Sequence, residues 1–89
     1  MKESGLYPIG TILKLKDATK PIIVTSVPYE YKGKKYDYLG LPYPFGYMDE
    51  RAYRLFNRED IDEVYFYGFL DKEQSEYLKY INQEGKKDV

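Results

Sequence analysis

The chain has 89 residues, of which 33% are charged and 43% hydrophobic, and it contains 12 tyrosines and 4 phenylalanines. A chain of this length forms one domain, and no apolar run reaches the about 20 residues that span a bilayer. Cysteine and histidine are both absent, which excludes disulfides, thiolate metal sites, thiol nucleophiles and the commonest general base. The lack of cysteine, and of an apolar signal sequence at the start, favours a cytoplasmic protein, and we expect that localisation.

The charges are nearly balanced, with 14 basic and 15 acidic residues and a net charge of −1. They are unevenly distributed, because residues 1–44 have a net charge of +3 and residues 45–89 a net charge of −4. This asymmetry indicates either a two-faced surface or two halves that mix in the fold. Dedicated nucleic-acid binders usually have a basic excess, which this chain lacks.

Two strands are predicted in the first third of the chain. Residues 9–16 alternate with a period of two, so their odd-numbered side chains share one face of a half-buried strand. Residues 17–21 are predicted to form a turn. Residues 22–27 are β-branched at five of six positions and apolar on both faces, which predicts the central strand. Pro28 should end it, since proline donates no hydrogen bond to a neighbouring strand.

The middle of the chain predicts a hairpin followed by a loop. Residues 32–34 are predicted to form the tip of the hairpin, since their central glycine adopts a positive φ at little cost. Residues 35–40 alternate as the return strand and place Tyr36 and Tyr38 on one face. Residues 41–48 contain two prolines, one glycine and three aromatics, which predicts a stiff loop.

The last third predicts strands and one helix. Residues 52–56 are interpreted as a short strand or, alternatively, as the start of a helix. Residues 57–60 begin with a good N-cap residue and carry acids that favour a single helical turn, and residues 64–69 then form a strand. A terminal helix follows, which Asp71 caps and Gly85 should end. Its predicted apolar stripe consists of Tyr77, Leu78 and Ile81.

These elements predict an α+β fold: a small antiparallel sheet or SH3-like barrel of four or five strands, with a short helical turn and a C-terminal helix. Residues 8–84 form the single small domain, between a loose N-terminus at residues 1–7 and a frayed tail at residues 85–89. The likeness to SH3-like barrels concerns architecture and assigns no function.

No catalytic or metal-binding constellation is found in the sequence. The acidic run at residues 59–63 is the nearest to one, but it has neither the length nor the glycine of a calcium loop. We interpret it as helix-start acids and solvated side chains. The serines have no histidine partner, and glycine-rich phosphate loops are absent. We therefore expect no enzyme activity, no cofactor and no metal.

The tyrosines are too numerous for a core of this size, so several must reach the surface, where tyrosine is a favoured interface residue. Aromatics in the stiff loop and on the return strand are the candidates for protein binding. These candidates are Tyr36, Tyr38, Tyr43, Phe45 and Tyr47. Tyr65 and Tyr67 are instead interpreted as half-buried strand residues.

An alternative function is nucleic-acid binding. Lys32, Lys34 and Lys35 are interleaved with tyrosines, and nucleic-acid surfaces combine cationic side chains with rings on which bases stack. The slightly negative net charge argues against this alternative.

Several stretches together resemble a known family. They are PIGTILKL at residues 8–15, YDYLG at residues 36–40, Tyr43-Pro44 with Gly46, and FNREDIDEVYFYG at residues 56–68. In this order they resemble a small Gram-positive bacterial family of unknown function, DUF4176, over residues 8–83. Residues 27–34, which we interpret as a variable hairpin, depart from the pattern of this family.

The resemblance implies a function, because members of this family are often encoded beside type VII secretion clusters and the LXG toxins that those systems export. It implies a cytoplasmic adaptor or chaperone that binds an LXG-type toxin before export, and it brings no catalytic residues. A compact domain with an exposed sheet edge could bind such a partner by side-chain docking or strand addition. The same edge could pair with a second copy and form a homodimer.

Overall fold

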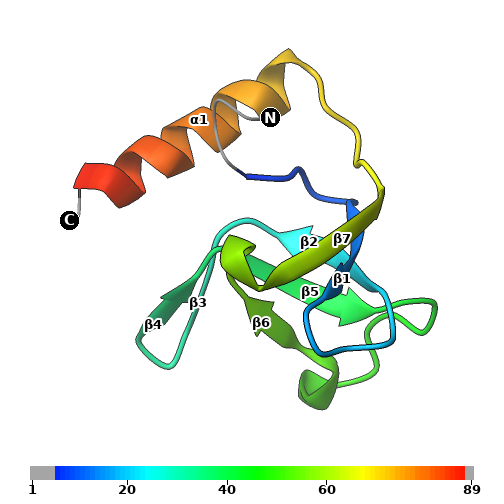
Figure 1. The fold of residues 1–89 in the computed structure, drawn as a ribbon. Coiled ribbons are helices and arrows are strands. Elements are labelled where there is room, and N and C mark those ends of the chain that lie inside the picture. Colours follow the sequence, from blue (N-terminus) through cyan, green and yellow to red (C-terminus); the bar gives the residue numbers. More distant parts are fainter. Residues whose placement is uncertain (1–5, 88–89) are drawn as a thin grey trace.

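The computed structural model describes residues 6–87 and confirms an α+β fold (Figure 1). The elements in chain order are β1 (Ile12–Leu15), β2 (Ile22–Ser26), β3 (Tyr29–Tyr31), β4 (Lys34–Tyr36), β5 (Tyr38–Pro42), the 3-10 turn η1 (Glu50–Ala52), β6 (Arg54–Phe56), the 3-10 turn η2 (Arg58–Asp60), β7 (Ile61–Phe66) and α1 (Lys72–Lys87). The expectations for residues 1–5 and 88–89 lie outside the described residues.

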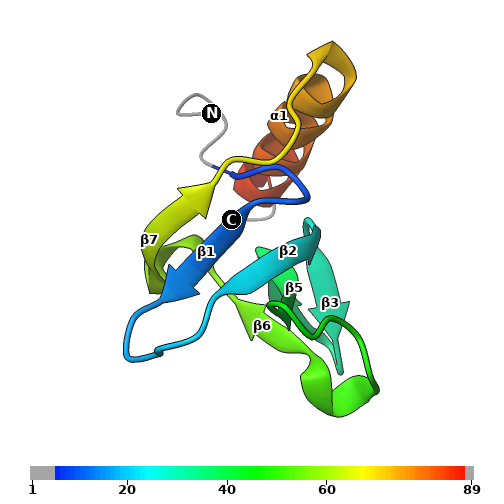
Figure 2. The ribbon, with the colours of Figure 1, turned by 90° about the vertical axis from the view of Figure 1, so that its right-hand side faces the viewer.

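Five of the strands form one antiparallel sheet in the order β6-β5-β2-β1-β7, and β3 and β4 form a separate hairpin (Figure 2). The β-branched strand β2 lies in the centre of the sheet, as predicted. The strands β6 and β7 form its two edges, so the sheet is open and does not close into a barrel. The hairpin tip is also confirmed, with φ of 52° at Lys32 and 82° at Gly33, which is the geometry of a type I′ turn.

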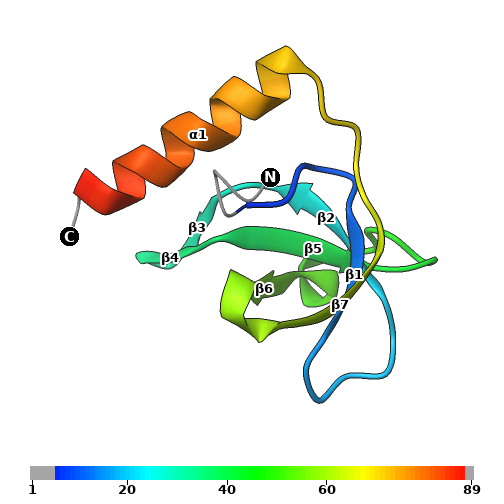
Figure 3. The ribbon, with the colours of Figure 1, turned by 45° about the horizontal axis from the view of Figure 1, so that its top comes forward.

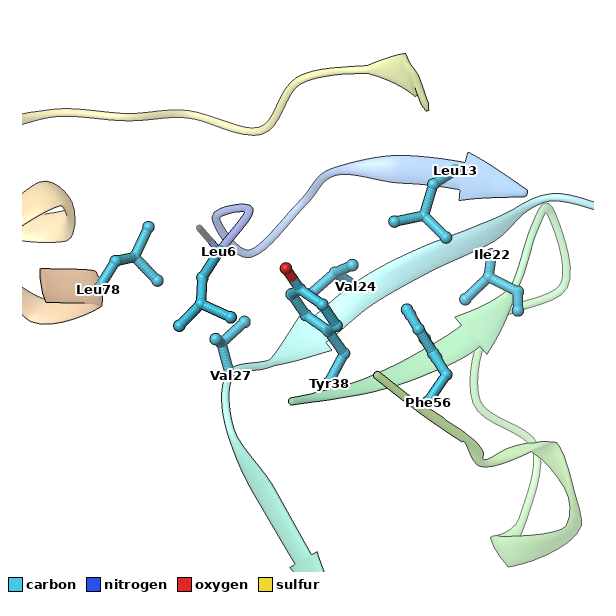
Figure 4. Packing of buried hydrophobic residues seen from close by; sticks show 8 residues of the cluster. All are labelled: Leu6, Leu13, Ile22, Val24, Val27, Tyr38, Phe56 and Leu78. Carbon is cyan, nitrogen blue, oxygen red and sulfur yellow. The ribbon is translucent and has the colours of Figure 1, made fainter. Parts of the chain in front are cut away.

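The core is built from side chains of the sheet, of α1 and of residues 6–11, which we call the N-terminal segment (Figure 4). Its buried members are Leu6, Leu13, Ile22, Val24, Val27, Tyr38, Phe56 and Leu78. The ring of Tyr38 stacks on Phe56 at a centroid distance of 5.2 Å, and its hydroxyl accepts a hydrogen bond of 2.8 Å from the backbone N–H of Tyr7. The prediction of a loose start is therefore wrong for residues 6 and 7, which pack against the core.

The predicted return strand at residues 35–40 is divided into β4 and β5 by Asp37. The backbone N–H of Asp37 donates to Asn57 Oδ1 at 2.9 Å, and its carboxylate accepts from the backbone N–H of Arg58 at 3.0 Å. These two bonds turn the chain from the hairpin into the sheet. Tyr36 therefore belongs to the hairpin and Tyr38 to the core, although the two residues were predicted to share a face.

The strands β1 and β7 differ in position from the prediction. β1 begins at Ile12 rather than at Ile9, because Gly10 lies in a turn with φ of 95° and Ile9 is exposed. β7 covers Ile61–Phe66 rather than residues 64–69, since its pairing with β1 starts at Leu15 opposite Ile61. The short strand β6 is confirmed, as is the helical turn η2 directly before the last strand.

The helix α1 lies beyond one end of the sheet, and the N-terminal segment passes between them (Figure 3). Asp71 caps the helix as predicted, since its Oδ1 accepts a hydrogen bond of 2.8 Å from the backbone N–H of Gln74. Leu78 is buried and Ile81 packs against the core, whereas Tyr77 of the predicted stripe is 46% exposed. The helix continues through Gly85 to Lys87, because a single glycine costs a helix only about 1 kcal/mol.

Candidate functional site

One face of the β3–β4 hairpin is covered with tyrosine rings. Tyr29 lies opposite Tyr36 and Tyr31 lies opposite Lys34, and residues that are paired in this way point to the same side of a hairpin. Two ammonium groups lie on these rings: Lys34 Nζ is 5.3 Å from the Tyr36 centroid, and Lys32 Nζ is 5.3 Å from the Tyr31 centroid. The hairpin therefore presents an aromatic face with cationic margins.

Tyr53, which follows η1, connects this hairpin to the loop after β5. Its ring meets Tyr29 and Tyr31 edge to face, at centroid distances of 6.0 and 6.5 Å, and it meets Tyr47 at 6.1 Å. The charge of the neighbouring Tyr29, and to a smaller extent burial, raises the pKa of Tyr53. Tyr53 thus contacts rings from two separate segments, β3 and the loop after β5.

The loop itself holds four large apolar side chains in solvent. It is fastened by hydrogen bonds from the Gly46 N–H to the Pro42 carbonyl at 2.7 Å and from the Tyr43 N–H to the Pro21 carbonyl at 3.1 Å. The exposed side chains are Tyr43 (47%), Phe45 (67%), Tyr47 (59%) and Met48 (69%). We call these four residues, together with Tyr29, Tyr31, Tyr36 and Tyr53, the aromatic surface.

The five aromatic residues predicted from the sequence to bind a protein partner differ in their exposure and location. Tyr43, Phe45 and Tyr47 lie exposed in the loop, and Tyr36 lies half-buried on the hairpin. Tyr38 is a correction, because its side chain is fully buried against Phe56 and has no surface to offer a partner. The sequence analysis missed Tyr53, although an aromatic residue shortly after the Pro/Gly-rich loop was a usable signal.

The three hairpin lysines do not line one continuous groove. Lys34 points to the tyrosine face of the hairpin, whereas Lys35 lies opposite Glu30 and points to the other face. Lys32 belongs to the turn and lies over Tyr31. The arrangement brings cations beside rings, but it distributes them over two faces.

Residues 6–77 match the family described as Domain of unknown function (DUF4176). The chain belongs to this family. The matched stretch contains all seven described strands and the first turns of α1. No curated protein and no solved structure matches the chain.

This DUF4176 domain has a second exposed apolar region around the end of β7 and the start of α1. Tyr65 and Tyr67 were interpreted as half-buried strand residues, but they are 52% and 45% exposed, and Tyr67 lies just beyond the end of β7. The Tyr67 ring packs edge to face on Tyr7 at 5.5 Å, and burial raises the pKa of Tyr67. Phe69 and Tyr80 are 77% and 60% exposed, and neither was singled out as an interface candidate from the sequence.

The acidic run of the DUF4176 domain is used structurally. Asp60 accepts a hydrogen bond from the backbone N–H of Asn57 and so completes the capping box of η2. Asp62 forms an ion pair with Lys14 at 2.7 Å, which lowers the pKa of the Asp62 carboxyl. Among the side chains of residues 6–82, no three acidic groups are placed in a way that could hold a metal ion. Within residues 6–87, no helix is long and apolar enough to cross a membrane.

Proposed function

We propose that this DUF4176 domain is a non-catalytic, protein-binding adaptor or chaperone for an LXG-type toxin of a type VII secretion system. The observation that supports protein binding is the aromatic surface, whose loop is held in place by backbone hydrogen bonds. The class of partner comes from the resemblance to a family whose members are often encoded beside such toxins. In this proposal the protein binds the toxin in the cytoplasm before export.

The physical argument for the aromatic surface concerns the cost of binding. Phe45 and Met48 are the most exposed large side chains of the loop, at 67% and 69%. Large aromatic side chains such as Phe45 act as the anchors that contribute most of the energy at protein interfaces. Because the loop backbone is hydrogen-bonded and Tyr47 is already packed on Tyr53, little conformational entropy remains to be lost when a partner binds.

The test is a tagged pull-down from native lysate, analysed by mass spectrometry, with the wild-type chain and with Phe45→Ala. We expect an LXG-type toxin in near-equal amounts with the wild type and its loss with Phe45→Ala. A matched control is Tyr80→Ala, which removes a similarly exposed ring outside the aromatic surface and should retain the toxin. Retention of the toxin by Phe45→Ala would contradict the assignment of the surface, and absence of any such toxin would contradict the proposed partner.

The alternative, a small nucleic-acid-binding protein, is supported by one arrangement only. Lys32 and Lys34 lie beside tyrosine rings, and stacking platforms for single-stranded nucleic acids have this composition. It predicts that RNA is recovered in the same pull-down and that its binding weakens steeply with salt. A flat salt series would exclude it.

A further inference from the structure

A groove is lined by residues of the N-terminal segment, of the connection between β7 and α1, and of the first turns of α1. These parts of the chain lie at the other end of the molecule from the β5–η1 loop (Figure 1, Figure 2). The groove has a volume of about 330 Å³, which is at the small end of the range for binding pockets. Its lining consists of Ile9, Phe69, Asp71, Glu73, Gln74 and Tyr77. This size suits one or two side chains of a partner rather than a folded element.

The apolar part of the groove is exposed and held in place. Phe69 is 77% exposed, and Ile9 and Tyr77 are 43% and 46% exposed. The residue before Phe69 is fixed, because the backbone of Gly68 is buried against Gly10 and its N–H donates to Thr11 Oγ1 at 3.1 Å. The chain therefore presents the Phe69 ring to solvent from a rigid point of attachment, which favours a preformed site.

The polar part of the groove is acidic. Asp71 and Glu73 contribute carboxylates, and no lysine or arginine is among the lining residues. Neither acid forms an ion pair with a side chain of residues 6–82. Asp71 caps α1, and acids stabilise the start of a helix. That role does not account for the exposed rings beside them. Gln74 also lines the groove, and its Oε1 atom is buried and accepts no hydrogen bond from the described part of the chain.

We infer that this groove binds a segment of a partner protein in which an arginine lies beside an apolar residue. The apolar side chain packs between Ile9, Phe69 and Tyr77. The planar guanidinium of arginine stacks on aromatic rings and pairs with carboxylates through two parallel hydrogen bonds, so it matches a site built from rings and acids. Lysine, a compact point charge, matches the same site less well. The inference is independent of the proposed function, because it concerns a different surface.

The experiment uses the full chain, labelled with ¹⁵N, and a short synthetic peptide that repeats Gly-Leu-Arg. We expect saturable NMR shift changes at the groove-lining residues, weaker binding of the Gly-Leu-Lys peptide and no binding of the Gly-Leu-Glu peptide. Phe69→Ala should lower the affinity about tenfold, as removal of an aromatic interface anchor does. Phe45→Ala, the same change on the aromatic surface, should leave the affinity unchanged.

A charge reversal provides a second variant that leaves the aromatic rings intact. Glu73→Lys should abolish binding of the arginine peptide, whereas Glu59→Lys, the same change in η2, should not. Equal binding of the arginine and glutamate peptides, full affinity in Phe69→Ala, or shift changes confined to the aromatic surface would each overturn the inference. So would a dimer in sedimentation that Phe69→Ala dissociates while no peptide binds, since the groove would then hold a second copy.

Discussion

The backbone N–H of Gly68 donates a hydrogen bond of 3.1 Å to the hydroxyl of Thr11, a fully buried side chain. A Cβ atom at Gly68 would overlap the Ile9 carbonyl and would lie 2.9 Å from the Thr11 nitrogen. The two backbone segments therefore approach each other without a side chain between them. This contact joins the end of the last strand to the start of the first strand, and it sets the direction in which the chain continues to Phe69.

Gly68→Ala is expected to destabilise the fold by about 2–3 kcal/mol, because the added methyl group meets backbone atoms that cannot rotate away. Gly33→Ala is the matched control. Gly33 has φ of 82° but no atom within 4 Å of its Cβ position, so the substitution costs only the left-handed conformation, about 1 kcal/mol. Urea denaturation of the two variants checks the difference. Equal destabilisation would show that the close approach at Gly68 is not important.

Tyr38→Phe is expected to destabilise the fold by about 1–2 kcal/mol, since it leaves the N–H of Tyr7 without its acceptor inside the structure. The ring remains stacked on Phe56, so the contribution of this packing to stability is retained. Denaturation at neutral pH measures this loss. A variant as stable as the wild type would mean that water replaces the hydroxyl without cost.

The same hydroxyl predicts a dependence of stability on alkaline pH. Burial raises the pKa of Tyr38 to about 12, from the ordinary value of about 10 for tyrosine. Between these two values the unfolded chain loses the proton and the folded chain keeps it, so stability falls as the pH rises. Tyr38→Phe should show a shallower fall over this window. Tyr53, Tyr67 and Lys14, whose pKa values are also raised, contribute to the part that remains.

Local sequence signals predicted the elements that depend on local interactions. The β-branched run at residues 22–27, the glycine of the hairpin tip and the capping residue Asn57 each specify their element without help from distant residues, and all three are confirmed. The break between β4 and β5 was not predictable in this way. It depends on the hydrogen bonds that link Asp37 to Asn57 and Arg58, which are about twenty residues away in the chain.

The same limit applies to the candidate sites. Tyr36 and Tyr38 are equivalent in the sequence pattern, yet one is on the hairpin and the other is in the core, because Asp37 turns the chain between them. Loop composition was sufficient to identify Phe45 as exposed, since prolines and glycine keep the segment out of the sheet. The exposure of Phe69 follows from the contact of Gly68 with Gly10, for which the sequence contains no signal.

The ion pair between Lys14 and Asp62 predicts a loss of stability at acidic pH. It lies across the β1–β7 pair at 2.7 Å and lowers the pKa of Asp62, mainly through the hydrogen bond from Lys14. A carboxyl whose pKa is lower in the folded state stabilises the fold above its unfolded pKa, and this contribution is lost as the pH falls through the folded pKa. In Asp62→Asn, the free energy of unfolding should depend less on pH over this acidic range. An unchanged profile would mean that solvent screens the pair.

Tyr53 is predicted to act as a positioning residue for the aromatic surface. Tyr53→Ala removes ring contacts to Tyr29, Tyr31 and Tyr47, so it should lower the thermal midpoint by several degrees. It should also weaken toxin binding, because the loop is no longer tied to the hairpin.

Tyr53→Phe keeps the three ring contacts and should restore both the midpoint and the binding. Phe45→Ala provides the comparison, since that side chain is 67% exposed and its removal should change binding without changing the midpoint. Thermal denaturation followed by circular dichroism measures the midpoints, and the pull-down measures the binding. If Tyr53→Ala keeps the wild-type midpoint, then the rings around it do not stabilise the loop. If it loses stability but binds the toxin fully, then the partner does not need the loop in this position.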